Sequence, residues 1–326
     1  MPANPDGRLA DLVLERFEQP FDSAFLSRLL LPGMNLNNLQ VRDMQRYRIL
    51  HRTYYTFTAP VQLQPHVLRL RPREDHELRI ESSTLEISPP AILRWHRDVE
   101  DNSVAIATFE TSASRLAIES EVVIQQYNEL PLDFVVDSEA VEYPFRYSPE
   151  DARVLLPYMD IASRGGEDVV RAWLESVWKH GEPIQTYALL QRLCSDIHER
   201  LSYRLREEPG VQRPVETLTL GTGSCRDSAA LFIEAARHLG FAARFVSGYL
   251  QAEPSAFNFG ATHAWAEVYL PGAGWKGFDP SIGEMAGAQH IAVAVARLPE
   301  SVPPVAGSFV GPPGAELSVG VWVSEL

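Results

Sequence analysis

The sequence lacks the features that mark disulfide-stapled, secreted or membrane-spanning proteins. Only 2 of its 326 residues are cysteine, so no disulfide framework is predicted. No apolar run approaches the roughly 20 residues that a membrane-spanning helix needs. Residues 1–6 have neither the basic nor the apolar region of a signal peptide. We therefore expect a cytoplasmic protein, because a reducing compartment keeps thiols free.

Positive charge is also scarce. Lysine and arginine number 29 against 43 aspartate and glutamate residues, which gives a formal net charge of −14. Such an acidic chain is a poor match for nucleic acid or for an anionic membrane, so neither is expected as a partner. The sequence has no CxxC, HExxH or Asp-x-Asp-x-Asp-Gly pattern. We therefore expect no cofactor and no metal site.

Two kinds of periodicity divide the chain. Residues 45–147 alternate apolar and polar side chains in short runs separated by turn residues, as around Tyr47 and Ile49. This pattern predicts an antiparallel β-sandwich. The apolar spacing then becomes helical, and strand-like runs return further along the chain. We therefore predict an α+β protein with a core over residues 148–326 and an N-terminal extension over residues 1–44.

The stretch from Gly221 to Ala230 is typical of a tight glycine turn that opens a helix. Ser224 and Asp227 have the spacing of a capping box, and Cys225 occupies the first helical position. Unpaired backbone N–H groups and the positive end of the helix dipole favour a thiolate there, which is the nucleophilic form of cysteine. The alternative for Cys225 is a small buried side chain, the commonest role of a free cysteine.

The other cysteine, Cys194, fits that structural role better. It falls on one apolar stripe with Leu190, Ile197 and Leu201, in a helix predicted to start at Pro183. A cysteine on such a stripe packs in the core and is inert. We therefore predict that Cys194 is buried and does not react.

A cysteine nucleophile needs a base and a group that orients the base, and a predicted hairpin offers both. The alternation over residues 262–270 puts His263 and Trp265 on one face of a strand. The return strand ends at Asp279. A three-residue turn would set Trp265 opposite Asp279 and make His263 the diagonal neighbour of Asp279. A four-residue turn would shift this register, so the spacing leaves both possibilities open.

Four motifs now occur in order along the chain. They are Gly223-Ser224-Cys225-Arg226-Asp227, residues 240–250, His263-Ala264-Trp265-Ala266-Glu267-Val268-Tyr269 and residues 274–281. Together they resemble the core of the bacterial transglutaminase-like family, which is similar to papain-type cysteine proteases in its Cys-His-Asp chemistry. The resemblance covers about residues 150–300. Residues 47–61 and 68–73 also resemble the N-terminal β domain that precedes this core in one bacterial branch.

The resemblance implies a role for each of three residues. Cys225 is the expected nucleophile, His263 the expected general base and acid, and Asp279 the group that orients His263. The thiolate would attack an amide of a protein or peptide substrate, or a glutamine side chain, and leave a thioester for water or an amine to resolve. The leading hypothesis for the function is a cysteine peptidase or amidase. A protein-glutamine acyltransferase and a non-catalytic scaffold that retains the core are the alternatives.

Other residues near these motifs receive supporting roles. The Cys225 backbone N–H is the expected first donor to the oxyanion, and Tyr203 or Trp178 is the expected second. Arg226 and Asp227 are expected to cap and balance the helix rather than to react. The loop from Gln251 to Ala261 could gate access to the site.

Overall fold

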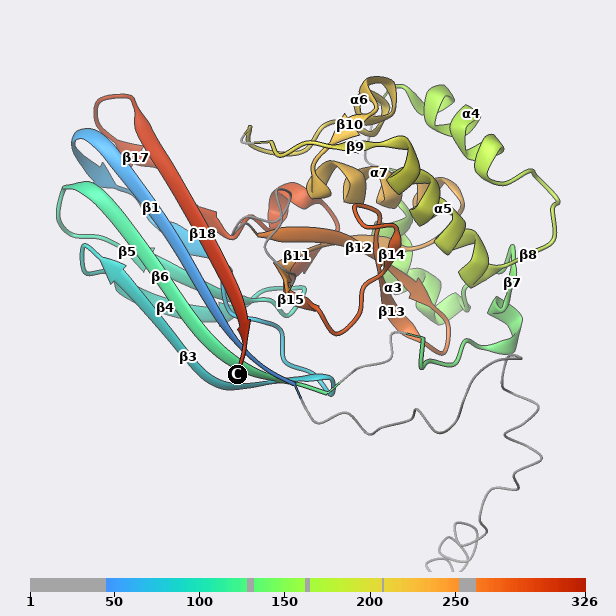
Figure 1. Ribbon diagram of the computed structural model, residues 1–326, viewed down its shortest axis with the longest axis horizontal. Coiled ribbons are helices and arrows are strands. Elements are labelled where there is room, and N and C mark those ends of the chain that lie inside the picture. The colour runs from blue at the N-terminus through green and yellow to red at the C-terminus, as the bar shows by residue number, and fades with distance from the viewer. Residues whose placement is uncertain (1–44, 128–131, 162–164, 207, 252–261) are drawn as a thin grey trace, which may run out of the picture. The chain divides into compact units, whose positions relative to one another are not determined.

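The computed structural model describes residues 45–127, 132–161, 165–206, 208–251 and 262–326 (Figure 1). The extension predicted over residues 1–44 and most of the loop that could gate the site, 252–261, lie outside these residues. Within the described part, antiparallel sheets and helices form an α+β fold, as the periodicity predicted.

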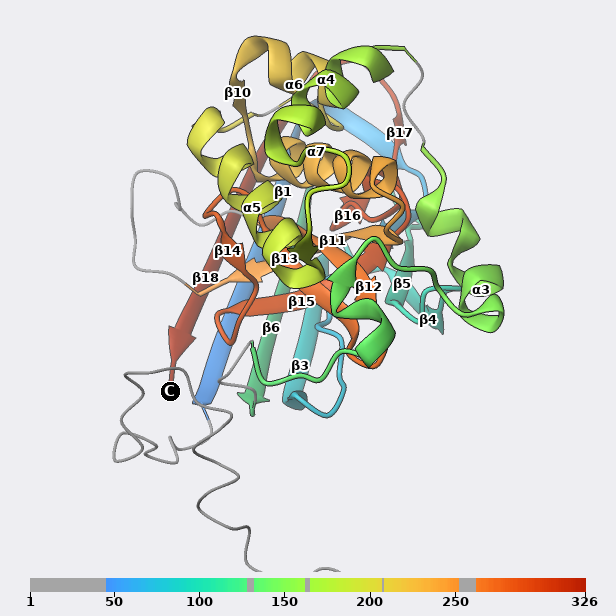
Figure 2. The ribbon, with the colours of Figure 1, turned by 90° about the vertical axis from the view of Figure 1, so that its right-hand side faces the viewer.

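Strands from the first part of the chain and from its C-terminal end form two antiparallel sheets. One has the order β18-β1-β6-β3, shown side by side in Figure 2, with β17 added at the end of β1. The other has the order β16-β2-β5-β4. The strands of the two sheets are β1 (Gln45–Leu63), β2 (His66–Leu68), β3 (Leu78–Ser88), β4 (Ile92–Arg97), β5 (Ser103–Thr108), β6 (Ala113–Gln126), β16 (Val305–Ala306), β17 (Phe309–Val310) and β18 (Ala315–Glu325).

Alternation along the long strands explains why the sheets pack face to face. Every second residue of β6 from Leu116 onward is buried. Leu116 and Ile118 of that strand share one apolar cluster with Leu68 of β2 and Ala105 of β5. Side chains from both sheets thus fill a common interior, which is the packing of a β-sandwich.

The predicted boundary at residue 148 needs two corrections. Strand β18 pairs with β1 from Tyr47↔Glu325 to Phe57↔Ala315, so the C-terminal strand belongs to the sandwich and not to the core. Conversely, β7 (Glu142–Tyr143) pairs with β8 (Ile184–Gln185), which joins residues before 148 to the core. Alternation identifies a strand but not its partner, because the partner of β18 lies far away in the sequence.

The core contains a five-stranded antiparallel sheet, β14-β13-β12-β11-β15, covered on one face by helix α7 (Figure 1). Its strands are β11 (Ala243–Leu250), β12 (His263–Leu270), β13 (Gly274–Asp279), β14 (Glu284–Met285) and β15 (His290–Ala296). The helices are α3 (Pro149–Met159), α4 (Glu167–Val177), α5 (Thr186–Arg200), α6 (Pro214–Leu220) and α7 (Cys225–His238), with 3-10 turns η2 (Ser138–Ala140) and η3 (Pro299–Ser301).

Helices α5 and α7 follow the sequence signals closely. Helix α7 starts at Cys225 with the predicted capping box and is followed by Gly240 at φ +85°, a backbone angle that favours glycine after a helix. Helix α5 begins at Thr186, three residues after the predicted start. Cys194 of α5 is fully buried in the core, as predicted. Among the described residues, no helix combines the length and apolar character needed to cross a membrane.

Side chains of the sandwich also bond to the core sheet. The Asn102 side chain donates to the carbonyl of Val295 in β15 and accepts from its N–H, both at 2.8 Å. His51 of β1 forms a buried hydrogen bond with Tyr249 of β11. These contacts fix the strand on the outer edge of the core sheet, β15, and its neighbour β11 against the sandwich.

Candidate active site

Cys225 is held by a rigid turn at the start of α7. The carboxylate of Asp227 accepts hydrogen bonds from the N–H and the hydroxyl of Ser224, each at 2.8 Å. Its other oxygen accepts from the Arg206 guanidinium and the Gln212 N–H, each at 2.7 Å. Asp227 is fully buried, and all four bonds offset the cost of burying its charge. The expectation that Asp227 caps the helix is therefore confirmed.

Two arginines, Arg206 and Arg226, link the preceding loop to this turn. Arg226 donates to the carbonyls of Arg206 and Glu208. Arg206 pairs with Asp227 from 21 residues away, and the sequence pattern gave no indication of it. The nucleophile candidate thus sits on a backbone that is hydrogen-bonded from two directions.

The β12–β13 hairpin has the register that brings a histidine to an aspartate. Leu270 pairs with Gly274, which leaves three residues in the turn, and Ala266 pairs with Phe278. Continuing this register sets Trp265 opposite Asp279 and His263 diagonal to Asp279. The Nε2 atom of His263 lies 2.5 Å from Oδ2 of Asp279. The three-residue turn is therefore confirmed.

His263 joins this carboxylate to the thiol. Burial acts to lower the pKa of His263, but the charge of Asp279 and hydrogen bonds with Asp279 and Cys225 raise it to about 10. Because Nε2 faces Asp279, Nδ1 is the ring nitrogen left for the Cys225 thiol. His263 is therefore held in its protonated form at neutral pH, beside a cysteine at a helix N-terminus.

Asp279 accepts four hydrogen bonds at the buried end of the site. Its side chain is fully buried, and burial alone would raise its pKa. The charge and hydrogen bond of His263, together with the hydrogen bond of His290, outweigh burial and hold the pKa of Asp279 well below its usual range. Ser281 adds its N–H at 2.9 Å and its hydroxyl at 2.6 Å to the other carboxylate oxygen. The carboxylate is thus kept ionised.

Of the two candidates for a second oxyanion donor, the structure brings one to Cys225. Strand β9 (Ser202–Tyr203) pairs in parallel with β10 (Thr222–Gly223), so Tyr203 lies beside the cysteine turn. Burial and interactions with Cys225, including a hydrogen bond, raise the pKa of Tyr203. Trp178 instead donates its indole N–H to the carbonyl of Glu182 at 2.9 Å, so its N–H is already committed and that suggestion was wrong.

His263, Asp279 and His290 also have the spacing of metal ligands. One ligand atom from each lies within 4.8 Å of the others, the one such group found in the described parts of the chain. However, the Nε2 atoms of both histidines hydrogen-bond to the same oxygen of Asp279. An ion between them would have to replace both bonds, so we do not identify these residues as metal ligands.

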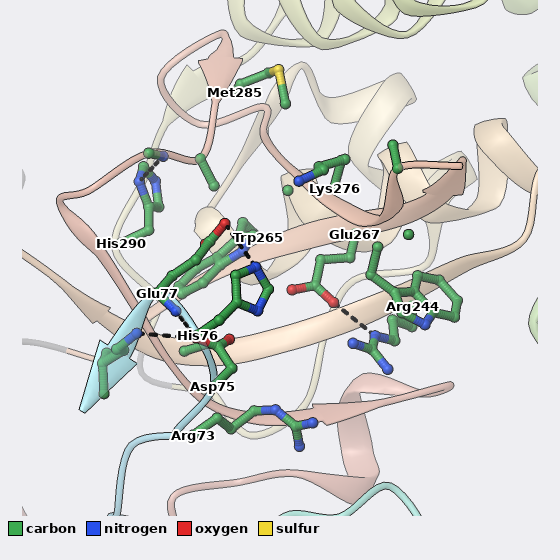
Figure 3. A pocket seen from close by; sticks show the side chains of 18 of the residues that line it. Arg73, Asp75, His76, Glu77, Arg244, Trp265, Glu267, Lys276, Met285 and His290 are labelled. Carbon is green, nitrogen blue, oxygen red and sulfur yellow. Dashed lines mark hydrogen bonds and ion pairs between the residues drawn. The ribbon is translucent and has the colours of Figure 1, made fainter. Parts of the chain in front are cut away.

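A cavity of about 360 Å³ lies beside this group, between sandwich and core residues (Figure 3). Its lining carries both signs of charge, with Arg73 and Glu77 from the sandwich and Arg244 and Glu267 from the core sheet. Arg244 donates to Glu267 at 2.7 Å, so their charges are paired. His290 lines the cavity, whereas Cys225 and His263 do not. The cavity therefore adjoins the carboxylate end of the site and not the thiol.

A buried Cys-His-Asp chain with its cysteine at a helix start is the arrangement of papain-like thiol enzymes. Comparison with known families agrees with this class. Residues 171–280 match the transglutaminase-like superfamily, and residues 47–125 match the bacterial transglutaminase-like N-terminal region. The chain thus carries a region that matches the bacterial transglutaminase-like N-terminal region, followed by one that matches the transglutaminase-like core.

Relatives align with this chain over most of their length. An uncharacterised protein of Mycobacterium leprae is 25% identical over 302 residues, which cover 87% of this chain and all of the relative. One of Mycobacterium tuberculosis is 27% identical over 283 residues, covering 83% of this chain and 89% of the relative. The crystal structure of a candidate cysteine protease from Cytophaga hutchinsonii matches with a TM-score of 0.67 at 15% identity, covering 87% and 92% of the two chains. The last likeness shows a shared fold.

Iodoacetamide added to the native protein should label Cys225 well before Cys194. Cys194 is fully buried, and burial together with the nearby Asp279 and Glu284 carboxylates raises its pKa, which disfavours the reactive thiolate. Cys225 lies instead at a helix start beside His263. Intact mass followed by peptide mapping would identify the labelled residue. Preferential labelling of Cys194 would contradict the assignment of the nucleophile.

Proposed function

We propose that this protein is a thiol enzyme that cleaves amide bonds of proteins or peptides through a thioester on Cys225. The observation that carries the proposal is the continuous chain from Cys225 through His263 to the buried carboxylate of Asp279. Such a chain supplies a nucleophile, an acid and a group that fixes the acid. A scaffold has no chemical need for a buried ionised carboxylate behind a protonated histidine.

The reaction would run in two halves. In the first, the Cys225 thiolate attacks the amide carbonyl, and a bond forms between sulfur and carbon. The His263 imidazolium gives its proton to the departing nitrogen as the carbon–nitrogen bond breaks, which leaves a thioester. In the second, neutral His263 takes a proton from water, the water oxygen bonds to the acyl carbon, and the sulfur leaves as the thiolate.

Two groups would stabilise the negative oxygen that forms in each half. The Cys225 N–H lies at the start of α7, where the helix dipole is positive. The Tyr203 hydroxyl interacts with the Cys225 side chain and is the second candidate donor. Preorganised donors of this kind are commonly the largest electrostatic contribution to acyl transfer.

Water is the acceptor that we favour, which makes the protein a peptidase or amidase. The Cytophaga hutchinsonii protein of similar fold, described as a candidate cysteine protease, supports this choice. Transfer of the acyl group of a glutamine to an amine would use the same three residues. We also propose a cytoplasmic location, since both cysteines are free.

The acceptor can be determined by incubating the reduced protein with labelled casein, with and without a primary amine. New peptide termini without amine incorporation are expected for hydrolysis. Incorporation of the amine would instead establish an acyltransferase. Intact mass would detect a thioester on Cys225 in either case. Absence of cleavage, of incorporation and of any adduct across a panel of amide substrates would favour a scaffold.

A further inference from the structure

His290 contacts the catalytic carboxylate but has no role in the mechanism described so far. It is the first residue of β15, and its side chain is 5% exposed. Its Nε2 atom lies 3.0 Å from Oδ2 of Asp279. Its Nδ1 atom accepts the N–H of Gly287 at 3.2 Å, as Figure 3 shows at the edge of the cavity. Because Nδ1 accepts, the proton of a neutral ring is on Nε2, and His290 donates to Asp279.

This bond completes the set of donors around Asp279. Oδ2 accepts from His263 on one side and from His290 on the other, while Oδ1 accepts two bonds from Ser281. Without His290, Oδ2 would have His263 as its one remaining donor. A fully buried carboxylate with fewer donors is more readily protonated, because burial favours its neutral form. It would also be freer to turn away from His263.

We propose that His290 is a positioning residue, which keeps Asp279 ionised and directed at His263 so that the thiolate–imidazolium pair forms at neutral pH. The inference rests on the proposed function. It gives β15, a strand at the edge of the core sheet, a role in activating the Cys225 thiol. The action is indirect, since His290 reaches Cys225 through Asp279 and His263.

Other ionisable groups around Asp279 define what the test must separate. The charge of Asp279 raises the pKa of Cys194 in α5 and of Tyr203 in β9, and His263 faces Asp279 from β12. His290 also packs edge-on against Trp265, with ring centroids 5.1 Å apart. If the role of His290 is purely structural, its substitution should reduce packing and stability. If His290 positions Asp279, its substitution should change the pH dependence of Cys225 alkylation.

The test is the rate of Cys225 alkylation by iodoacetamide as a function of pH, followed by intact mass and requiring no substrate. His290→Leu removes the donor at similar volume. His290→Gln returns an N–H at the position of Nε2, and His290→Asn is too short to reach Asp279. The matched control is His51→Leu, which removes a buried histidine whose hydrogen-bond partners are Tyr249 and Thr53 and not Asp279.

We expect His290→Leu and His290→Asn to lower the alkylation rate at pH 6.5 by at least about tenfold, which is the effect of a one-unit rise in the pKa of the thiol. Near pH 9 the alkylation rate of both variants should return to that of wild type. His290→Gln should restore most of the rate at pH 6.5. His51→Leu should lower the melting temperature and leave the pH profile unchanged. A cooperative melting transition for each variant shows that it is folded, and His290→Gln keeps the inference testable if His290→Leu fails to fold.

Two results would overturn the inference in distinguishable ways. A reactive wild type with the same profile in His290→Leu and His290→Asn would overturn the role of His290 alone. Loss of reactivity in His290→Gln equal to that in His290→Leu would do the same, because the donated hydrogen bond would then be irrelevant. A wild-type Cys225 that is unreactive at neutral pH would overturn both this inference and the proposed function.

Discussion

Replacing Cys225 with serine is expected to lower amide turnover by at least about a thousandfold, in the range seen when a nucleophile is removed from a catalytic triad. The reason lies in His263. The charge and hydrogen bond of Asp279 raise the pKa of His263 independently of Cys225, so at neutral pH the ring carries a proton and cannot accept one from a serine hydroxyl. A thiol ionises beside this imidazolium, but a hydroxyl does not. Casein cleavage would measure the effect.

Cys194→Ala provides the matched control for this result. Cys194 is fully buried in α5, and its sulfur lies 3.6 Å from the carbonyl of Glu284. Its loss should lower the melting temperature and leave turnover within a few-fold of wild type. A Cys225→Ser variant with turnover close to that of wild type would contradict the assigned nucleophile.

Asp279→Asn is expected to lower turnover by about 100-fold to 10,000-fold while the protein remains folded. Asparagine keeps the shape of the side chain and can still accept hydrogen bonds from Ser281. It removes the charge that holds His263 protonated, and it allows the ring to adopt the wrong tautomer. The imidazolium of the variant should therefore lose its proton at a lower pH than that of wild type.

The same substitution should change how stability depends on pH. The pKa of His263 rises from its ordinary value of 6.5 to about 10 in the folded protein. Its contribution to the free energy of unfolding is therefore complete below pH 6.5 and is lost as pH rises toward 10. Denaturant unfolding of wild type should show this decline, and Asp279→Asn should flatten it. An equal slope in both proteins would mean that Asp279 does not hold the proton on His263.

Local sequence signals were enough to predict the β12–β13 hairpin and the helix that begins at Cys225. The capping pair Ser224 and Asp227 lies within one turn of helix, and every second residue of β12 from Ala264 to Leu270 is buried and apolar. Both features depend on residues close together in the chain. The placement of Cys225, His263 and Asp279 follows from them once the turn between β12 and β13 has three residues.

Residues that act from a distance could not be predicted in the same way. His290 reaches Asp279 from β15, although β11 and β12 lie between β15 and β13 in the sheet. Arg206 reaches Asp227 from a loop without regular spacing. Neither pairing has a period or a motif, because each depends on the order of strands or the path of a loop. Only a prediction of the strand order in the core sheet would have indicated that His290 lies near Asp279.

The pairing of β18 with β1 has a consequence for how the chain acquires its structure. During synthesis β1 is made early, and one edge of it stays without its partner until residues 315–325 follow. Everything between them, including Cys225 and His263, is made in that interval. Contacts between such distant segments form slowly, because the entropy of closing a long loop is lost before the contacts can stabilise the fold. Until β18 is made, this edge of β1 presents unpaired backbone N–H and C=O groups that can pair with the wrong strand.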